Sequence, residues 1–83
     1  MPADLLPLAA KLAMRCVTFY RGGPHYRCWR CAECWTWSAR DARVPAHERG
    51  CVAEQVLRLA GITEPARDYE QQQAQLAEVA HAA

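Results

Sequence analysis

The chain of 83 residues is long enough for one small domain, and it carries five cysteines and a net charge of +1. A core of this size supplies roughly 3–5 kcal/mol, so we expect an additional staple such as a bound metal, a disulfide or a partner chain. No apolar run of about 18 residues occurs, which excludes a membrane-spanning helix. The first fifteen residues lack the basic start of a secretory signal, so we expect reduced cysteines, whose clustering favours a metal.

An amphipathic helix is predicted within residues 1–13. Asp4 is a suitable N-cap at its start. Leucines then recur at the three- and four-residue spacing of one helical stripe, at Leu5, Leu8 and Leu12.

A β-hairpin is predicted next. Residues 14–21 are rich in β-branched and aromatic side chains, residues 25–30 alternate in character, and a Gly-Gly-Pro turn separates the two runs. If residues 21–23 formed the loop, Cys16 would lie opposite Cys28 as a pair of buried thiols. A third short strand is predicted over residues 35–39.

Two further helices are predicted after the hairpin. Pro45 suits the first turn of a helix that runs to about Ala60 and ends at Gly61. Thr63 can cap a last, amphipathic helix within residues 62–83, whose polar face is rich in Glu and Gln.

The clearest chemical motif is Cys31-x2-Cys34-x12-His47-x3-Cys51. Sulfur and imidazole are ligands that zinc prefers, and structural zinc sites fill four tetrahedral positions with them. Residues four apart on a helix share a face, so His47 and Cys51 are predicted to converge on the Cys-x2-Cys turn. We therefore predict one structural Zn²⁺ held by these four residues. The pair Cys28 and Cys31 has the same spacing and is an alternative for the first two ligands.

Residues 29–51 resemble the zinc-finger class in its Cys-Cys-His-Cys form. Trp29, Trp37 and Val44 stand near the positions where ββα fingers carry their aromatic and leucine core residues. Pro45 at the very start of the helix, and an aromatic residue one position early, are closer to treble-clef-like fingers. The resemblance is to small single-finger proteins of phage or bacterial type, and it implies a small fold built around a structural zinc.

The predicted fold is therefore α+β, with residues 1–83 as a single domain. It would consist of an N-terminal helix over 1–13, a zinc-binding ββ(β)α unit over 14–61 and an amphipathic C-terminal helix over 62–83. Four soft ligands leave a zinc ion no open coordination position, so we expect no catalytic residue and no enzyme activity.

Charge is unevenly distributed along the chain. Residues 11–49 carry eight basic and three acidic residues, whereas residues 50–83 carry two basic and five acidic ones. Arginines neutralise phosphates and aromatic side chains stack on bases, and both kinds surround the predicted zinc turn. Nucleic acid, or the machinery that transcribes it, is therefore the first predicted partner. Its candidate contacts are Arg27, Arg30, Arg40 and Arg43.

A protein-docking role is the second hypothesis. The segments from Leu5 to Leu12 and from Ile62 to Ala80 flank the zinc unit and would seat it on a larger protein assembly or on a second copy of itself. By size and composition the chain is similar to accessory or inhibitor proteins of phages and bacteria, such as host-takeover or virion components. Both hypotheses describe a non-enzymatic binding module in the cytoplasm of a bacterial or phage-infected cell.

Overall fold

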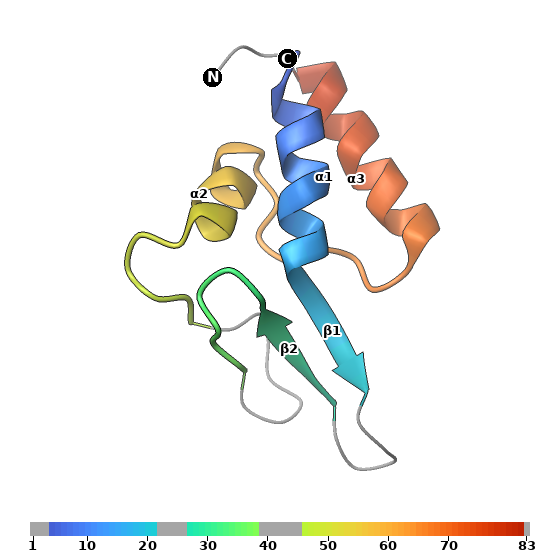
Figure 1. The fold of residues 1–83 in the computed structure, drawn as a ribbon. Helices are drawn as coiled ribbons and strands as arrows, with labels where there is room; N and C mark the ends of the chain where they lie inside the picture. The colour runs from blue at the N-terminus through green and yellow to red at the C-terminus, as the bar shows by residue number, and fades with distance from the viewer. Residues whose placement is uncertain (1–3, 22–26, 39–45, 83) are drawn as a thin grey trace.

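The computed structural model describes residues 4–21, 27–38 and 46–82 (Figure 1). In chain order these residues form helix α1 (Leu6–Cys16), strand β1 (Val17–Arg21), strand β2 (Arg27–Cys31), helix α2 (Val52–Leu59) and helix α3 (Tyr69–Ala82). Helix α1 packs against both α2 and α3, and the β-hairpin extends from its C-terminal end (Figure 1). The α+β class predicted from the sequence is confirmed. No helix in the described ranges is long and apolar enough to cross a bilayer.

Helix α1 begins and ends later than predicted. Leu5, and not Asp4, is its N-cap residue, and no side chain caps the helix. Pro7 falls in the first turn, where its missing N–H removes no helical hydrogen bond. Residues 14–16, predicted as strand, are helical because Met14 continues the buried face of the helix.

The buried face of α1 consists of small side chains and not of the predicted leucine stripe. Ala10 and Ala13 are buried beside Met14 and allow the neighbouring helices to approach closely. The leucines lie on another face and are about half exposed: Leu5, Leu8 and Leu12. Helix α1 therefore has a second apolar face that the described residues do not cover.

The hairpin register differs from the prediction. Val17 pairs with Cys31, and Tyr20 pairs with Cys28, in an antiparallel sheet of two strands. Cys16 does not lie opposite Cys28, because five residues and not three separate β1 from β2. The helical conformation of Cys16 also removes it from the strand.

The third strand predicted over residues 35–39 is reduced to one isolated bridge between Arg30 and Trp37. Around this bridge, Ser38 N donates to Trp29 O at 2.9 Å, and Trp29 N donates to Ser38 Oγ at 2.8 Å. The segment after β2 therefore lies along the strand without extending into a full ladder.

Helix α2 is shorter at its start than predicted. It begins at Val52, with Cys51 as its N-cap residue, and residues 46–51 are not helical. Gly50 has a φ of +87°, a left-handed conformation that a right-handed helix cannot continue through. Pro45, predicted in the first turn, lies outside the described residues.

The predicted end of α2 at Gly61 is confirmed. Gly61 has a φ of +76°, and its N–H donates to Arg58 O at 3.1 Å. Ile62 N donates to Leu57 O at 2.9 Å. This pair of bonds is the Schellman arrangement, in which glycine adopts the left-handed conformation after the last helical turn.

Helix α3 is capped by Asp68 and not by Thr63. The Asp68 Oδ1 atom accepts a hydrogen bond from Gln71 N at 2.9 Å, three positions into the helix. Residues 64–66 stay outside the helix because Gln75 holds their backbone: its Oε1 accepts from Ala66 N, and its Nε2 donates to Glu64 O.

The core lies where the hairpin meets the helices. Trp29 is its largest fully buried side chain and meets Phe19 edge to face, with ring centroids 5.5 Å apart. The Arg67 guanidinium stacks on the Phe19 ring, 4.1 Å from its centroid. The buried apolar residues come from all elements and include two of the predicted ligands: Ala10, Ala13, Met14, Val17, Trp29, Cys31, Cys51, Ala53, Leu57, Ile62 and Val79.

Two leucines of α2 provide a matched test of this core. Leu57 is 4% exposed and Leu59 is 68% exposed. We expect Leu57→Ala to lower the free energy of unfolding by about 2–5 kcal/mol, because it leaves a cavity. Leu59→Ala should change it by only about 0.5 kcal/mol. Urea unfolding of both variants, followed by circular dichroism, measures the difference, and equal effects would contradict the described core.

Candidate metal centre

The structure brings together the four residues predicted as ligands. The donor atoms of Cys31, Cys34, His47 and Cys51 all lie within 4.8 Å of one another. Cys31 ends β2, Cys34 ends the turn that follows it, His47 lies in the irregular segment 46–51, and Cys51 is the N-cap of α2. The cluster therefore joins the hairpin to α2.

The sequence-based explanation of how His47 and Cys51 come together is wrong. His47 and Cys51 do not converge as neighbours on one helical face, because residues 46–51 are not helical. The left-handed Gly50 ends this segment and turns the chain into α2. Cys51 N donates to Glu48 O at 3.1 Å, which closes the turn that carries both ligands.

The turn after β2 presents the first two sulfurs. Trp35 N donates to Cys31 O at 2.9 Å, and Cys31 N donates to Thr36 O at 3.0 Å. These bonds fold the chain back on itself directly after Cys34. The turn requires a φ of +62° at Trp35, in the left-handed region that residues other than glycine rarely adopt.

The separations of the donor atoms fit one shared four-coordinate ion. The sulfurs of Cys31 and Cys51 are 3.7 Å apart, and the sulfur of Cys34 is 3.4 Å from Nδ1 of His47. Metal–sulfur bonds of about 2.3 Å and metal–nitrogen bonds of about 2.0–2.1 Å place tetrahedral neighbours about 3.8 Å and about 3.6 Å apart. The four side chains could therefore hold a single metal ion.

The surroundings of Cys34 favour its thiolate. Burial raises the pKa of this half-buried thiol, but hydrogen bonds from the Thr36 hydroxyl, from the backbone N–H groups of Glu48 and Thr36, and from His47 outweigh burial. The result is a pKa of about 6. The Thr36 hydroxyl oxygen lies 3.1 Å from the sulfur. Cys34 is therefore ready to bind a cation at neutral pH.

Cys31 behaves in the opposite way. Its burial raises the pKa of the thiol to about 12, although backbone N–H groups of Cys34 and Glu33 are directed at the sulfur. A buried thiol in this position keeps its proton at neutral pH unless a cation compensates the charge. Binding of a metal at the cluster must therefore release this proton.

The two remaining cysteines lie outside the cluster. Cys28 is buried in β2, and Cys16 is half-buried at the end of α1. Cys28 and Cys31 are three residues apart on one strand, so their side chains project to opposite faces of the sheet. The structure therefore groups Cys31 with Cys34, and not with Cys28, around His47.

The predicted nucleic-acid contacts are described only in part. Arg27 is exposed at the start of β2, and Arg30 is half-buried on the same strand. The Arg30 guanidinium lies over the Trp37 ring, 5.6 Å from its centroid. Arg40 and Arg43 lie outside the described residues.

The position of Trp37 differs from what the zinc-finger resemblance implies. This ring is 48% exposed and meets Tyr20 edge to face, with centroids 5.8 Å apart, instead of filling the core. Trp29, placed by the same resemblance, is buried as expected. Tyr20, Arg30 and Trp37 form what we call the aromatic patch. Tyr20 and Arg30 lie on different strands, so the sequence could not place them on one face without the register of the hairpin.

Comparison with known proteins found no matching family model, no matching curated protein and no matching solved structure. The resemblance to zinc fingers therefore rests on the Cys-Cys-His-Cys cluster itself.

Two cysteine variants distinguish the two possible ligand pairs. We expect Cys34→Ala to abolish stoichiometric metal binding, because it removes a donor from the cluster and three ligands hold a structural ion poorly. Cys28→Ala should retain one bound metal per chain, since its sulfur belongs to the other face of the sheet. Elemental analysis after exchange against a mild chelator measures both. Retained metal in Cys34→Ala together with loss in Cys28→Ala would reverse the assignment.

Proposed function

We propose that the protein is a non-enzymatic, zinc-stabilised module that binds nucleic acid. The observation that carries this proposal is the aromatic patch, in which the Arg30 guanidinium lies over the partly exposed Trp37 ring. We further propose that it acts with the transcription machinery as a small regulator in a bacterial or phage-infected cell, in line with the single-finger resemblance.

The donor set supports zinc as the metal. Three sulfurs and one imidazole, with donor atoms within 4.8 Å of one another, are a combination found in structural zinc sites, whereas Mg²⁺ and Ca²⁺ prefer oxygen ligands. All four positions would be filled by side chains of this chain. An ion held in this way has a structural role, because a catalytic zinc keeps one position for water or substrate.

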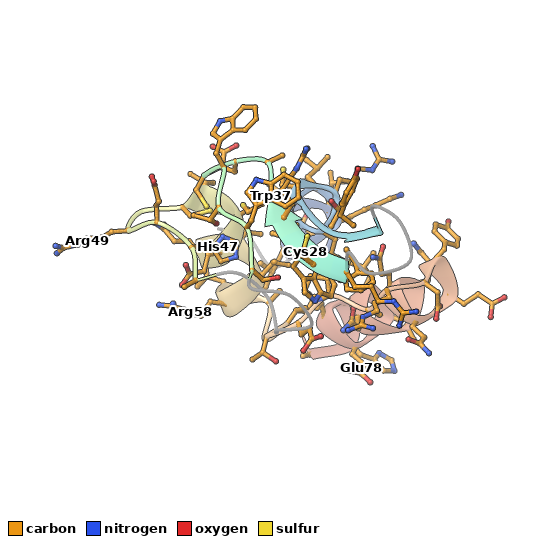
Figure 2. All side chains as sticks on the ribbon, turned by 90° about the horizontal axis from the view of Figure 1, so that it is seen from below. Cys28, Trp37, His47, Arg49, Arg58 and Glu78 are labelled. Carbon is orange, nitrogen blue, oxygen red and sulfur yellow. The ribbon has the colours of Figure 1, made fainter. Side chains whose placement is uncertain are left out.

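The distribution of charge supports an anionic ligand on the hairpin. Arg30 of β2 is stacked on the partly exposed Trp37, and Arg27, three residues earlier, is exposed on the opposite face of the same strand. The acidic helix α3 lies elsewhere: Trp37 and Glu78 are on opposite sides of the molecule (Figure 2). A polyanion on the aromatic patch would therefore not meet the carboxylate of Glu78.

Salt dependence and arginine substitution test this function. We expect a labelled oligonucleotide mixture to bind at low salt, with affinity falling as salt rises. The combined variant Arg27→Ala, Arg30→Ala, Arg40→Ala and Arg43→Ala should weaken binding at least about tenfold. The slope of log affinity against log salt concentration should also become less negative, by about 0.7–0.9 for each phosphate that the variant no longer neutralises. Fluorescence anisotropy measures both quantities.

Arg58→Ala is the matched control for charge. Arg58 is exposed on α2 and forms an ion pair with Glu54, so its loss should leave the affinity unchanged. Absence of binding to any DNA or RNA at low salt would refute the proposed function.

A second candidate function is docking onto a larger protein assembly, and an apolar groove favours it. The groove runs between α1 and α2 and is lined mostly by apolar side chains: Ala9, Leu12, Ala13, Cys16, Glu33, Val52, Ala53 and Val56. Exposed leucines stand one helical turn from its lining: Leu8 from Leu12 on α1, and Leu59 from Val56 on α2. A groove between two helices is a common seat for an amphipathic helix of a partner.

Introducing negative charge at the groove tests the docking role. We expect the double variant Leu8→Asp and Leu12→Asp to lose a protein partner that the wild-type chain retains after nuclease treatment, because two carboxylates would be desolvated at the interface. Tyr69→Asp, on exposed α3, is the control. Pulldown from host lysate with mass spectrometry provides the measurement. If nuclease removes every captured protein, the docking role is wrong.

A further inference from the structure

We infer that the nucleic acid bound by this protein is single-stranded, and that Trp35 stacks on one of its unpaired bases. This inference rests on the proposed function and specifies the class of nucleic acid that the aromatic patch would take.

Tryptophan is an unusual residue at position 35 for two reasons. Its backbone has a φ of +62°, where glycine would be free of steric strain and a large side chain is not. Its side chain is 75% exposed, although tryptophan gains most from burial. In the described part of the chain, the indole makes no hydrogen bond and no contact with another ring. The described residues therefore give no structural reason for tryptophan at this position.

The turn fixes the backbone of Trp35 and leaves its ring available. Trp35 N donates to Cys31 O at 2.9 Å. This hydrogen bond closes the turn that contains the candidate ligands Cys31 and Cys34. The following residue, Thr36, donates from its hydroxyl to the Cys34 sulfur 3.1 Å away and accepts from Cys31 N through its carbonyl. The metal centre would hold the backbone of Trp35 in place, so only the side-chain rotamers of the indole remain to be ordered when a nucleobase stacks on it.

The aromatic patch supplies further stacking and charge next to Trp35. Trp37 follows two residues later and is about half exposed. Its ring is held by Tyr20 on its edge, at 5.8 Å, and by the Arg30 guanidinium over its face, at 5.6 Å. Exposed aromatic rings interleaved with arginines are the usual means of binding single strands, because each base offers a face and each phosphate a charge.

The described helices are poorly suited to reading a duplex. Duplex readers insert a helix or ribbon with polar side chains into the major groove. The exposed surface of α1 carries three leucines besides Lys11 and Arg15, the exposed arginine of α2 is paired with Glu54, and the first turn of α3 carries Glu70. In a duplex the bases are also stacked on each other, so a projecting indole would find no free base face.

The inference is tested with three labelled probes of one mixed sequence: a 15-nucleotide DNA strand, the matching RNA strand and the 15-base-pair DNA duplex. We expect zinc-loaded wild-type protein to bind at least one of the single strands about tenfold or more tighter than the duplex in fluorescence anisotropy. Trp35→Gly should lose about tenfold or more of the single-strand affinity while the weak duplex binding stays the same. Trp35→Phe should keep most of the affinity.

Trp35→Gly also separates binding from folding. Glycine suits the left-handed backbone, so the thermal midpoint and the metal content of this variant should equal or exceed those of the wild type. Trp35→Asn, which also tolerates this conformation, is a second variant should the first misfold. Tyr69→Ala removes another exposed ring, on α3, and should leave binding unchanged.

The possible failures are distinguishable. If single strands and duplex bind equally, or if Trp35→Gly and Trp35→Asn keep full single-strand affinity, the inference is wrong while nucleic-acid binding stands. If none of the three probes binds at low salt, the proposed function itself fails. Capture of a protein partner through Trp35 in the absence of any probe binding would likewise overturn both.

Discussion

Four donor atoms at the junction of the hairpin and α2 are the constraint on which the rest of the structure depends. The sulfurs of Cys31 and Cys51, twenty residues apart in sequence, are 3.7 Å apart in space. Neither part that they join is stable alone, because a two-stranded hairpin and a helix of eight residues are both marginal in water. A shared metal ion would supply the free energy that this small core lacks, and it would also fix the turn from which Trp35 projects.

The surfaces around this junction are separated by character. The aromatic patch lies on one face of the hairpin, the apolar groove lies between α1 and α2, and Glu78 of α3 lies across the molecule from Trp37 (Figure 2). This separation allows one small chain to meet a polyanion on one side and a protein on another. It also gives the uneven charge along the sequence a spatial meaning.

The ligand set was predictable because it depends on local spacing and on donor chemistry. The preference for Cys34 over Cys28 was predicted as well, and the structure adds a physical reason for it, because Cys28 and Cys31 point to opposite faces of one strand. Helix boundaries were missed where distant residues decide them: the Gln75 side chain keeps residues 64–66 out of α3, and Met14 extends α1 into the predicted strand. The left-handed conformation of Trp35 could not be read from a residue type that rarely adopts it.

The most direct test of the account is removal of the metal from the purified chain, followed by circular dichroism and native mass spectrometry. The account predicts one zinc ion per chain, loss of the helical signal and of cooperative melting when a strong chelator removes it, and recovery of both when zinc is returned. A chain that carries no stoichiometric metal, or one that keeps its cooperative fold in the chelator, would contradict the central claim.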